Sequence, residues 1–218
     1  MKKKHAALVL ALIMALAVLT CGASASGSGD IINSSRSGVV RIAAYGPSSL
    51  IMDSAGDLYI MEMAYSFGSG FGVGETGQET VNFVTNTHVV TFEPEVYDEE
   101  GNYLGATSMP ASNVYIMLND LSWDPLTHTV DQSQCVPCEV LYYSESGYPD
   151  YAILKAARPV TECKPLAIRS SESVKQGETV VALGCPAVVD DLSATVGSND
   201  ITATRGTVAR HMVMSAAG

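Results

Sequence analysis

Positive charge is scarce in this sequence. Its 218 residues include 12 lysines and arginines against 23 aspartates and glutamates, which gives a formal net charge of -11 at pH 7. Nucleic acids and anionic lipid surfaces attract proteins mainly through lysine and arginine. The composition therefore argues against nucleic acid and anionic lipid as partners, and it says little about chemistry.

Long apolar runs are also missing, with one exception near the N-terminus. A basic start at residues 2–4 precedes 15 apolar residues at 6–20, and small residues at 23–25 suit signal peptidase. The run is short for a membrane-spanning helix, which needs about 20 residues. We predict a cleaved signal peptide over residues 1–25 and a secreted or cell-surface, extracytoplasmic protein. A membrane partner is expected only if this segment stays uncleaved.

Helical periodicity is absent from the rest of the chain, and so is the composition of a disordered one. Only 16% of the residues are charged and 47% are hydrophobic, so a packed core is expected. Frequent glycine, valine, threonine and tyrosine favour a β-rich fold with tight turns, and the short apolar runs indicate an all-β barrel or sandwich. The expected strands are Val39–Tyr45, Leu58–Tyr65, Val81–Asn86, Val114–Leu118, Cys138–Tyr143, Tyr151–Lys155, Thr179–Leu183 and Ile201–Ala209.

Three polar segments are expected to lie outside the strands. Residues 26–35 read as a flexible lead-in, and residues 93–113 and 119–134 as surface excursions. The acidic cluster at 98–100 could hold calcium weakly, but a solvated turn is the preferred interpretation.

Cysteine is limited to four residues once the signal peptide is removed: Cys135, Cys138, Cys163 and Cys185. An even count in an exported chain favours disulfides, with three possible pairings. Cys138 with Cys163 is the expected pair, because one flanks the strand before Asp150 and the other follows it. Free buried thiols and a zinc site stay open as alternatives. Cys135 and Cys138 have zinc-knuckle spacing, but the other two do not form a second close pair.

Two segments carry the residue types of an acid–base pair. His88 follows the apolar strand at 81–84, where a rigidly held ring can face a cleft as a general base must. Asp150 opens the apolar strand of Tyr148–Lys155, where a carboxylate is costly unless it is paired, and an imidazole is its natural partner. Each residue alone also fits a purely structural role. Together they predict a hydrogen bond between the His88 ring and the Asp150 carboxylate.

These motifs and their order resemble the trypsin-like serine peptidases of the HtrA/Deg type. The matching stretches are GSGF at 68–71, TNTHVV at 85–90 and DYAILK at 150–155. Downstream, PLAI at 165–168, TVVALGCP at 179–186 and TRGTVA at 204–209 continue the match, which covers roughly residues 36–210.

The resemblance implies a chymotrypsin-like double β-barrel. Its first barrel would be complete over residues 36–168, while residues 169–218 would supply a linker and the opening strands of a truncated second barrel. It also implies that His88 is the general base and Asp150 its orienting carboxylate in a Ser-His-Asp triad acting on polypeptide substrates. No cofactor or metal is expected, because the glycine run at 68–74 lacks the Lys-Ser/Thr end of a phosphate loop.

The nucleophilic serine of that family is not found. The family places it in a Gly-Asn-Ser-Gly-Gly loop, a context shared by none of the later serines, which are Ser170, Ser171, Ser173, Ser193, Ser198 and Ser215. Cys185 also stands where the family has an asparagine. We therefore expect a fragment of a secreted serine endopeptidase that is inactive as it stands. The alternatives are a non-catalytic, protease-like peptide-binding protein and a secreted structural β-domain.

Overall fold

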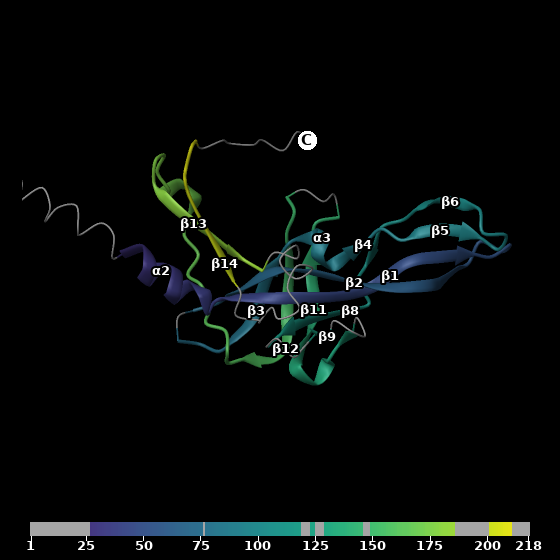
Figure 1. Ribbon diagram of the computed structural model, residues 1–218, viewed down its shortest axis with the longest axis horizontal. Helices are drawn as coiled ribbons and strands as arrows, with labels where there is room; N and C mark the ends of the chain where they lie inside the picture. The colour runs from purple at the N-terminus through teal and green to yellow at the C-terminus, as the bar shows by residue number, and fades with distance from the viewer. Residues whose placement is uncertain are drawn as a thin grey trace, which may run out of the picture. The chain divides into compact units, whose positions relative to one another are not determined.

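The computed structural model describes residues 27–75, 77–118, 123–124, 129–145, 149–185 and 201–210. The chain divides into two units, residues 1–36 and 37–218. Nearly all of the regular structure is β (Figure 1), so the all-β prediction is confirmed. The expected signal peptide lies outside the described residues. Within the described part of the chain, no helix has the length and apolarity needed to cross a membrane.

The first unit contains one described helix, α2 (Gly27–Arg36). The lead-in predicted over residues 26–35 coincides with this helix. Ser34 donates its hydroxyl to the carbonyl of Ile31 within the helix, and Arg36 lies in the last turn, where a cation interacts favourably with the helix dipole. Such local contacts are not visible in a composition of small and polar residues.

Six strands close a barrel in the second unit. β1 (Val39–Met52) and β2 (Leu58–Val73) form a long hairpin. The ring continues through β3 (Thr80–Thr85), β12 (Ala152–Val160), β11 (Cys135–Tyr143) and β8 (Asn113–Met117), and β8 pairs back with β1. Every neighbouring pair in the ring is antiparallel.

The barrel is filled by apolar side chains that alternate along its strands. The fully buried residues at its centre are Ile42, Phe83, Ile116, Val136 and Leu154. A second buried cluster, formed by Ala43, Tyr115, Met117, Val130 and Cys135, covers the outward side of β1 and β8. Because these strands are buried on both faces, their sequences read as nearly continuous apolar runs.

Shorter elements connect and extend the barrel. They are α3 (Thr87–Val90), β4 (Thr91–Phe92), β5 (Glu95–Asp98), β6 (Tyr103–Ala106), β7 (Met109–Pro110), β9 (Trp123–Asp124), β10 (Thr129–Val130), η2 (Gln132–Gln134), η3 (Ser171–Ser173), β13 (Thr179–Gly184) and β14 (Thr202–Thr207). β13 and β14 pair as an antiparallel hairpin outside the barrel. All eight strands expected from the sequence are present, and β1 and β2 are several residues longer than expected.

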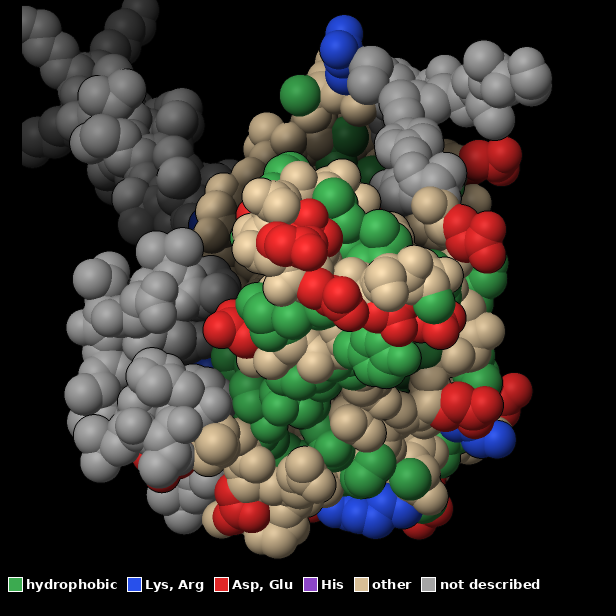
Figure 2. All heavy atoms as spheres, turned by 90° about the vertical axis from the view of Figure 1, so that its right-hand side faces the viewer, with side chains coloured by type: hydrophobic (Ala, Val, Ile, Leu, Met, Phe, Trp, Pro, Cys, Tyr) green, Lys and Arg blue, Asp and Glu red, His purple; other side chains and the backbone are tan. Residues whose placement is uncertain are grey.

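The outer halves of β1 and β2 run on beyond the barrel (Figure 1). There β5 pairs in parallel with β1, and β6 pairs antiparallel with β5. The resulting four-stranded sheet, residues 49–63 with 95–106, is called the arm below. The surface excursion predicted over 93–113 therefore lies on the arm, and it contains the strands β5 and β6, which the sequence analysis did not predict. Figure 2 looks onto the tip of the arm and shows carboxylates surrounding apolar side chains.

The four described cysteines are free thiols, so the expected disulfide between Cys138 and Cys163 is absent. Cys138 lies on β11 between Val114 of β8 and Ala156 of β12. Cys163 follows β12, and a β-carbon at Gly72 of β2 would lie 2.9 Å from its sulfur. The thiols of Cys138 and Cys163 thus lie at separate positions in or against the apolar core. Burial raises the pKa of Cys138 to about 12 and that of Cys163 to about 11.

We expect the thiols of Cys138 and Cys163 to resist alkylation in the folded protein. The thiolate is the reactive form, and burial both hides the sulfur and suppresses its ionisation. Mass spectrometry of protein treated with iodoacetamide at mildly alkaline pH, without reductant, should show labelling of these cysteines only after unfolding. A disulfide-linked peptide in the unreduced sample would contradict the assignment of free thiols.

Candidate active site

His88 lies in α3, a single helical turn that begins where β3 ends. Asn86 precedes the turn in an extended conformation, with φ -87° and ψ 150°. Thr87, Val89 and Val90 are buried, whereas 71% of the His88 side chain is exposed. The buried neighbours anchor the turn in the core, so the imidazole is held at the surface by a fixed backbone.

The glycine at position 68 makes room for this turn. A β-carbon there would lie 2.3 Å from Cγ2 of Val89, the core residue that follows His88. Real β-carbons do not approach a neighbour this closely, so Gly68 permits β2 to run directly beneath α3. Part of the GSGF motif therefore has a packing role, which is to let the histidine turn lie against the barrel.

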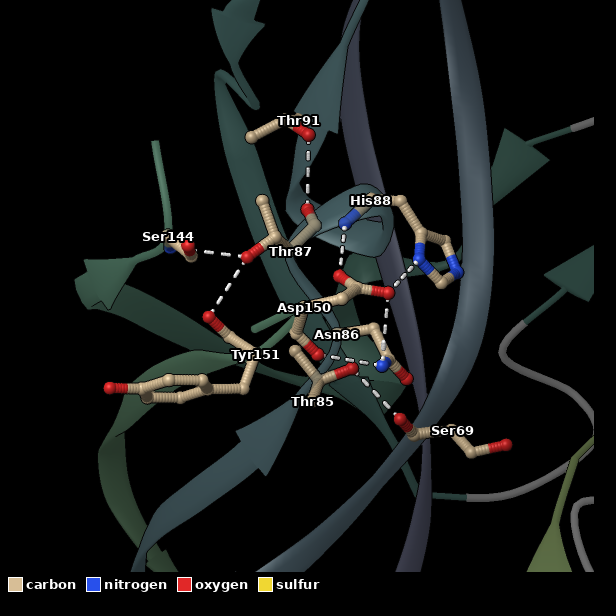
Figure 3. A network of polar contacts seen from close by, with 9 residues as sticks. All are labelled: Ser69, Thr85, Asn86, Thr87, His88, Thr91, Ser144, Asp150 and Tyr151. Atoms are coloured by element: carbon tan, nitrogen blue, oxygen red, sulfur yellow. Dashed lines mark hydrogen bonds and ion pairs between the residues drawn. The ribbon is translucent and has the colours of Figure 1, made fainter. Parts of the chain in front are cut away.

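Asp150 holds His88 by two contacts. Its Oδ2 lies 2.6 Å from Nδ1 of the ring, and its Oδ1 accepts a hydrogen bond of 3.2 Å from the His88 backbone amide. The contact expected from the sequence is thus present. Figure 3 shows the second ring nitrogen, Nε2, pointing away from Asp150. One carboxylate therefore orients both the ring and the backbone of this histidine.

Asn86 in turn holds Asp150. Its side-chain amide donates to the backbone carbonyl of Asp150 at 2.9 Å and to Oδ2 at 3.2 Å. Asp150 Oδ2 is consequently shared between the ring of His88 and the amide of Asn86 (Figure 3). The sequence indicated His88 and Asp150 but not this positioning role, although the polar residues before the histidine were a visible signal.

Thr87 connects the histidine turn to the residues next to β11 and β12. Its hydroxyl donates to the carbonyl of Tyr151 at 2.8 Å and accepts from the amide of Ser144 at 3.1 Å. Thr91 closes the turn by donating its hydroxyl to the carbonyl of Thr87 at 3.1 Å. The carbonyls of Tyr151 and Thr87 and the amide of Ser144 thus have side-chain partners outside the strand ladders. These contacts hold the backbone around His88 in place.

Ser69 links the histidine strand to the hairpin outside the barrel. Its carbonyl accepts the hydroxyl of Thr85, at 2.8 Å. Its own hydroxyl accepts the backbone amide of Cys185, at 2.7 Å. Gly184 is required beside it, since a β-carbon there would lie 2.9 Å from the Ser69 Oγ. The GSGF segment therefore connects β3 with the end of β13, in addition to packing beneath α3.

The carboxyl group of Asp150 is perturbed by competing effects. Partial burial is the largest and would raise its pKa, but hydrogen bonds from the ring and amide of His88, with the attraction of that ring, outweigh it. The net result is a pKa below the ordinary value of 3.8. Asp150 is therefore ionised at neutral pH, as an acceptor of the His88 ring proton must be.

The later serines give no nucleophile within the described residues. Ser170, Ser171 and Ser173 lie at η3, an exposed turn in which the Ser170 hydroxyl accepts the amide of Glu172. The other three, Ser193, Ser198 and Ser215, lie outside the described residues. Across the described ranges, no cluster of His, Cys, Asp and Glu is arranged to hold a metal ion.

Comparison with known proteins gives one family. The family model for a trypsin-like peptidase domain matches residues 68–216. No curated protein sequence matches the chain significantly.

The solved structures that resemble the chain include two forms of one protease. One is the inactive form of the Rv3671c protease, with 18% sequence identity and a TM-score of 0.45 over 86% of this chain. The other is the active form of that protease from M. tuberculosis, with 19% identity and a TM-score of 0.43 over 81% of this chain. This chain spans 59% and 50% of the lengths of those two.

We expect Gly68→Ala to destabilise the protein by about 1–3 kcal/mol, the usual cost of forcing an extra carbon into a packed site. Urea denaturation measures this, and Gly206→Ala on β14, whose new carbon would meet only Val180 at 3.9 Å, is the matched control. Adding Val89→Ala should relieve part of the clash. Equal stability of the two glycine variants would contradict the packing role.

A second expectation concerns the titration of Asp150. Because its pKa is lower in the folded state, the stabilisation it provides is fully present above its unfolded value and is lost as pH falls through the folded value. NMR titration of the carboxyl carbon should therefore give a midpoint below 3.8. His88→Ala should raise that midpoint while Thr91→Ala leaves it in place. An unchanged midpoint in His88→Ala would show that the ring does not act on this carboxylate.

Proposed function

This chain belongs to the trypsin-like peptidase domain family, and from that premise we propose that it carries the base and the orienting carboxylate of a secreted serine endopeptidase. The closed six-stranded barrel, with further strands outside it, matches the chymotrypsin-like fold. The observation that supports the proposal most directly is the contact of 2.6 Å between His88 Nδ1 and Asp150 Oδ2. Secretion is proposed from the signal-peptide pattern of residues 1–25.

In the proposed reaction, each of these side chains has a step in acyl transfer. Asp150, ionised at neutral pH, accepts a hydrogen bond from Nδ1–H, which keeps the proton on Nδ1 and leaves Nε2 as the basic nitrogen. Nε2 takes the proton of a serine hydroxyl as that oxygen attacks the peptide carbonyl, and it later gives the proton to the leaving amine. Asp150 stabilises the imidazolium formed between these two steps. Asn86 and Thr87 act as positioning residues that keep His88 and Asp150 in hydrogen-bonding contact.

The nucleophile and the oxyanion donors are the missing part of this scheme. No serine after Asp150 is followed by glycine, whereas the oxyanion site of this mechanism is built from backbone amides in a tight glycine-rich turn. We therefore propose that this polypeptide alone does not hydrolyse peptide bonds above a residual rate. Loss of one triad member costs several orders of magnitude in rate.

A second candidate function rests on that same observation. A chain that keeps the barrel, His88 and Asp150 without a serine in the right context could bind extended polypeptide without cutting it. The two candidates differ in one property, since only a protease reacts covalently with a serine-directed probe.

A fluorophosphonate probe tests the proposal. The chain of this sequence should not be labelled, whereas a longer product of the same gene that carries a Gly-x-Ser-Gly loop should be. In that product His88→Ala should reduce labelling at least about a thousandfold, while His128→Ala serves as the control for losing a histidine. Serine labelling of the present chain that depends on His88 would contradict the proposed inactivity. A longer product that binds unfolded protein and is never labelled would favour the second candidate.

A further inference from the structure

The arm belongs to a long region without positive charge. Residues 42–154 contain no lysine or arginine and 16 aspartates and glutamates. Seven of these carboxylates lie on the arm, at Asp53, Asp57, Glu62, Glu95, Asp98, Glu99 and Glu100. Figure 2 shows carboxylates around the apolar tip and basic side chains only near the margins of that view. A surface of this kind attracts cations and repels anionic partners.

The outer end of β2 is an exposed apolar edge strand. Leu58, Tyr59, Ile60 and Met61 are 46–56% exposed, which is unusual for four consecutive large apolar residues. β1 pairs with one side of this stretch, and no described strand pairs with the other side. An edge of this kind presents unpaired backbone groups to which another strand can add.

One face of the arm combines aromatic rings with carboxylates. Ser49 of β1 lies directly between Glu62 of β2 and Glu95 of β5, which places the three side chains on the same face. The next row on that face contains Ile51 between Tyr59 and Tyr97. Aromatic rings bind cations through their faces, and carboxylates bind them through charge.

Tyr97 contacts side chains on both sides of it on the arm. Tyr97 donates its hydroxyl to the carboxylate of Glu95, and its ring packs edge-on against Tyr103 with centroids 5.8 Å apart. Glu95, Tyr97 and Tyr103 therefore form one connected group of a carboxylate and two rings, which suits lysine and arginine side chains.

A buried hydroxyl in this face has no partner. Ser49 is 6% exposed, and within the described structure its Oγ makes no hydrogen bond. Buried polar groups are nearly always satisfied, so one without a partner between two carboxylates is consistent with a ligand that is absent here.

From this arrangement, we propose that the arm binds extended cationic polypeptide segments, which add as a strand to the free edge of β2. Backbone hydrogen bonds to Leu58–Met63 would supply sequence-independent affinity. Alternate side chains of the added strand would then lie beside Tyr59 and Glu62, where lysine or arginine meets both an aromatic ring and a carboxylate. This inference does not depend on the proposed catalysis.

A second copy of this chain fits the arm less well. Antiparallel pairing of two β2 edges would bring together two surfaces that carry the same cluster of carboxylates and no basic residue. Like charges placed opposite each other weaken strand pairing and suppress association. The charge pattern therefore favours a partner of opposite sign.

The test measures binding of labelled peptides to the full chain by fluorescence anisotropy. An alternating Arg-Val peptide should bind, and raising the salt concentration should weaken it. The matched Glu-Val peptide should not bind, and an Arg-Val peptide methylated on every backbone nitrogen should bind at least about tenfold more weakly, because it has no backbone N–H to donate to the edge of β2. Equal binding of the Glu-Val peptide, or of the methylated peptide, would overturn the proposal.

Charge-matched variants locate the surface. Glu62→Gln with Glu95→Gln should raise the Kd for the Arg-Val peptide about fivefold, since two partly exposed ion pairs are lost. Glu79→Gln with Glu139→Gln removes the same charge from exposed positions before β3 and on β11, and should change the Kd less than twofold. Equal effects of the two double variants would show that net charge alone is responsible. Sedimentation that reveals a dimer, together with no peptide binding, would assign the edge to a second copy instead.

Discussion

Antiparallel pairing of β3 with β12 places Thr85 opposite Ala152 and so joins two strand ends that lie far apart in the sequence. Beyond this last pair, the chain on one side turns into α3 and on the other comes from Asp150. The polar contacts of the site follow from that register, because His88 and Asp150 are 62 positions apart and meet only here. A slip of one residue in either strand would turn the side chains of that strand to the opposite face and separate His88 from Asp150. The hydrophobic core, in which Phe83 and Leu154 are fully buried, fixes the register.

The barrel strands could be predicted from the sequence because each is a short apolar run that ends at turn residues. The histidine and the aspartate could be predicted for a related reason, since polar residues at the ends of apolar strands need partners. Asn86 and Thr87 could not be assigned roles in advance, because their contacts depend on the pairing of β3 with β12 rather than on any local pattern.

Other features depend on contacts that a linear pattern does not contain. No strands were expected in the excursion over 93–113, yet β1 is long enough to pair with β5 beyond the barrel. The cysteines were expected to pair because their number is even, but Cys138 and Cys163 occupy separate places in the core. In both cases a neighbour distant in sequence decided the outcome.

All six barrel strands lie between Val39 and Val160, and the ring closes within that stretch. The β13–β14 hairpin lies outside this ring, and a hydrogen bond from the Cys185 amide to the Ser69 hydroxyl joins the end of β13 to β2. Every ladder partner of the barrel has been made before residue 161 is added, so the barrel can close while the remainder of the chain is still emerging. The outer hairpin then docks onto a surface that already exists, with His88 and Asp150 already in contact.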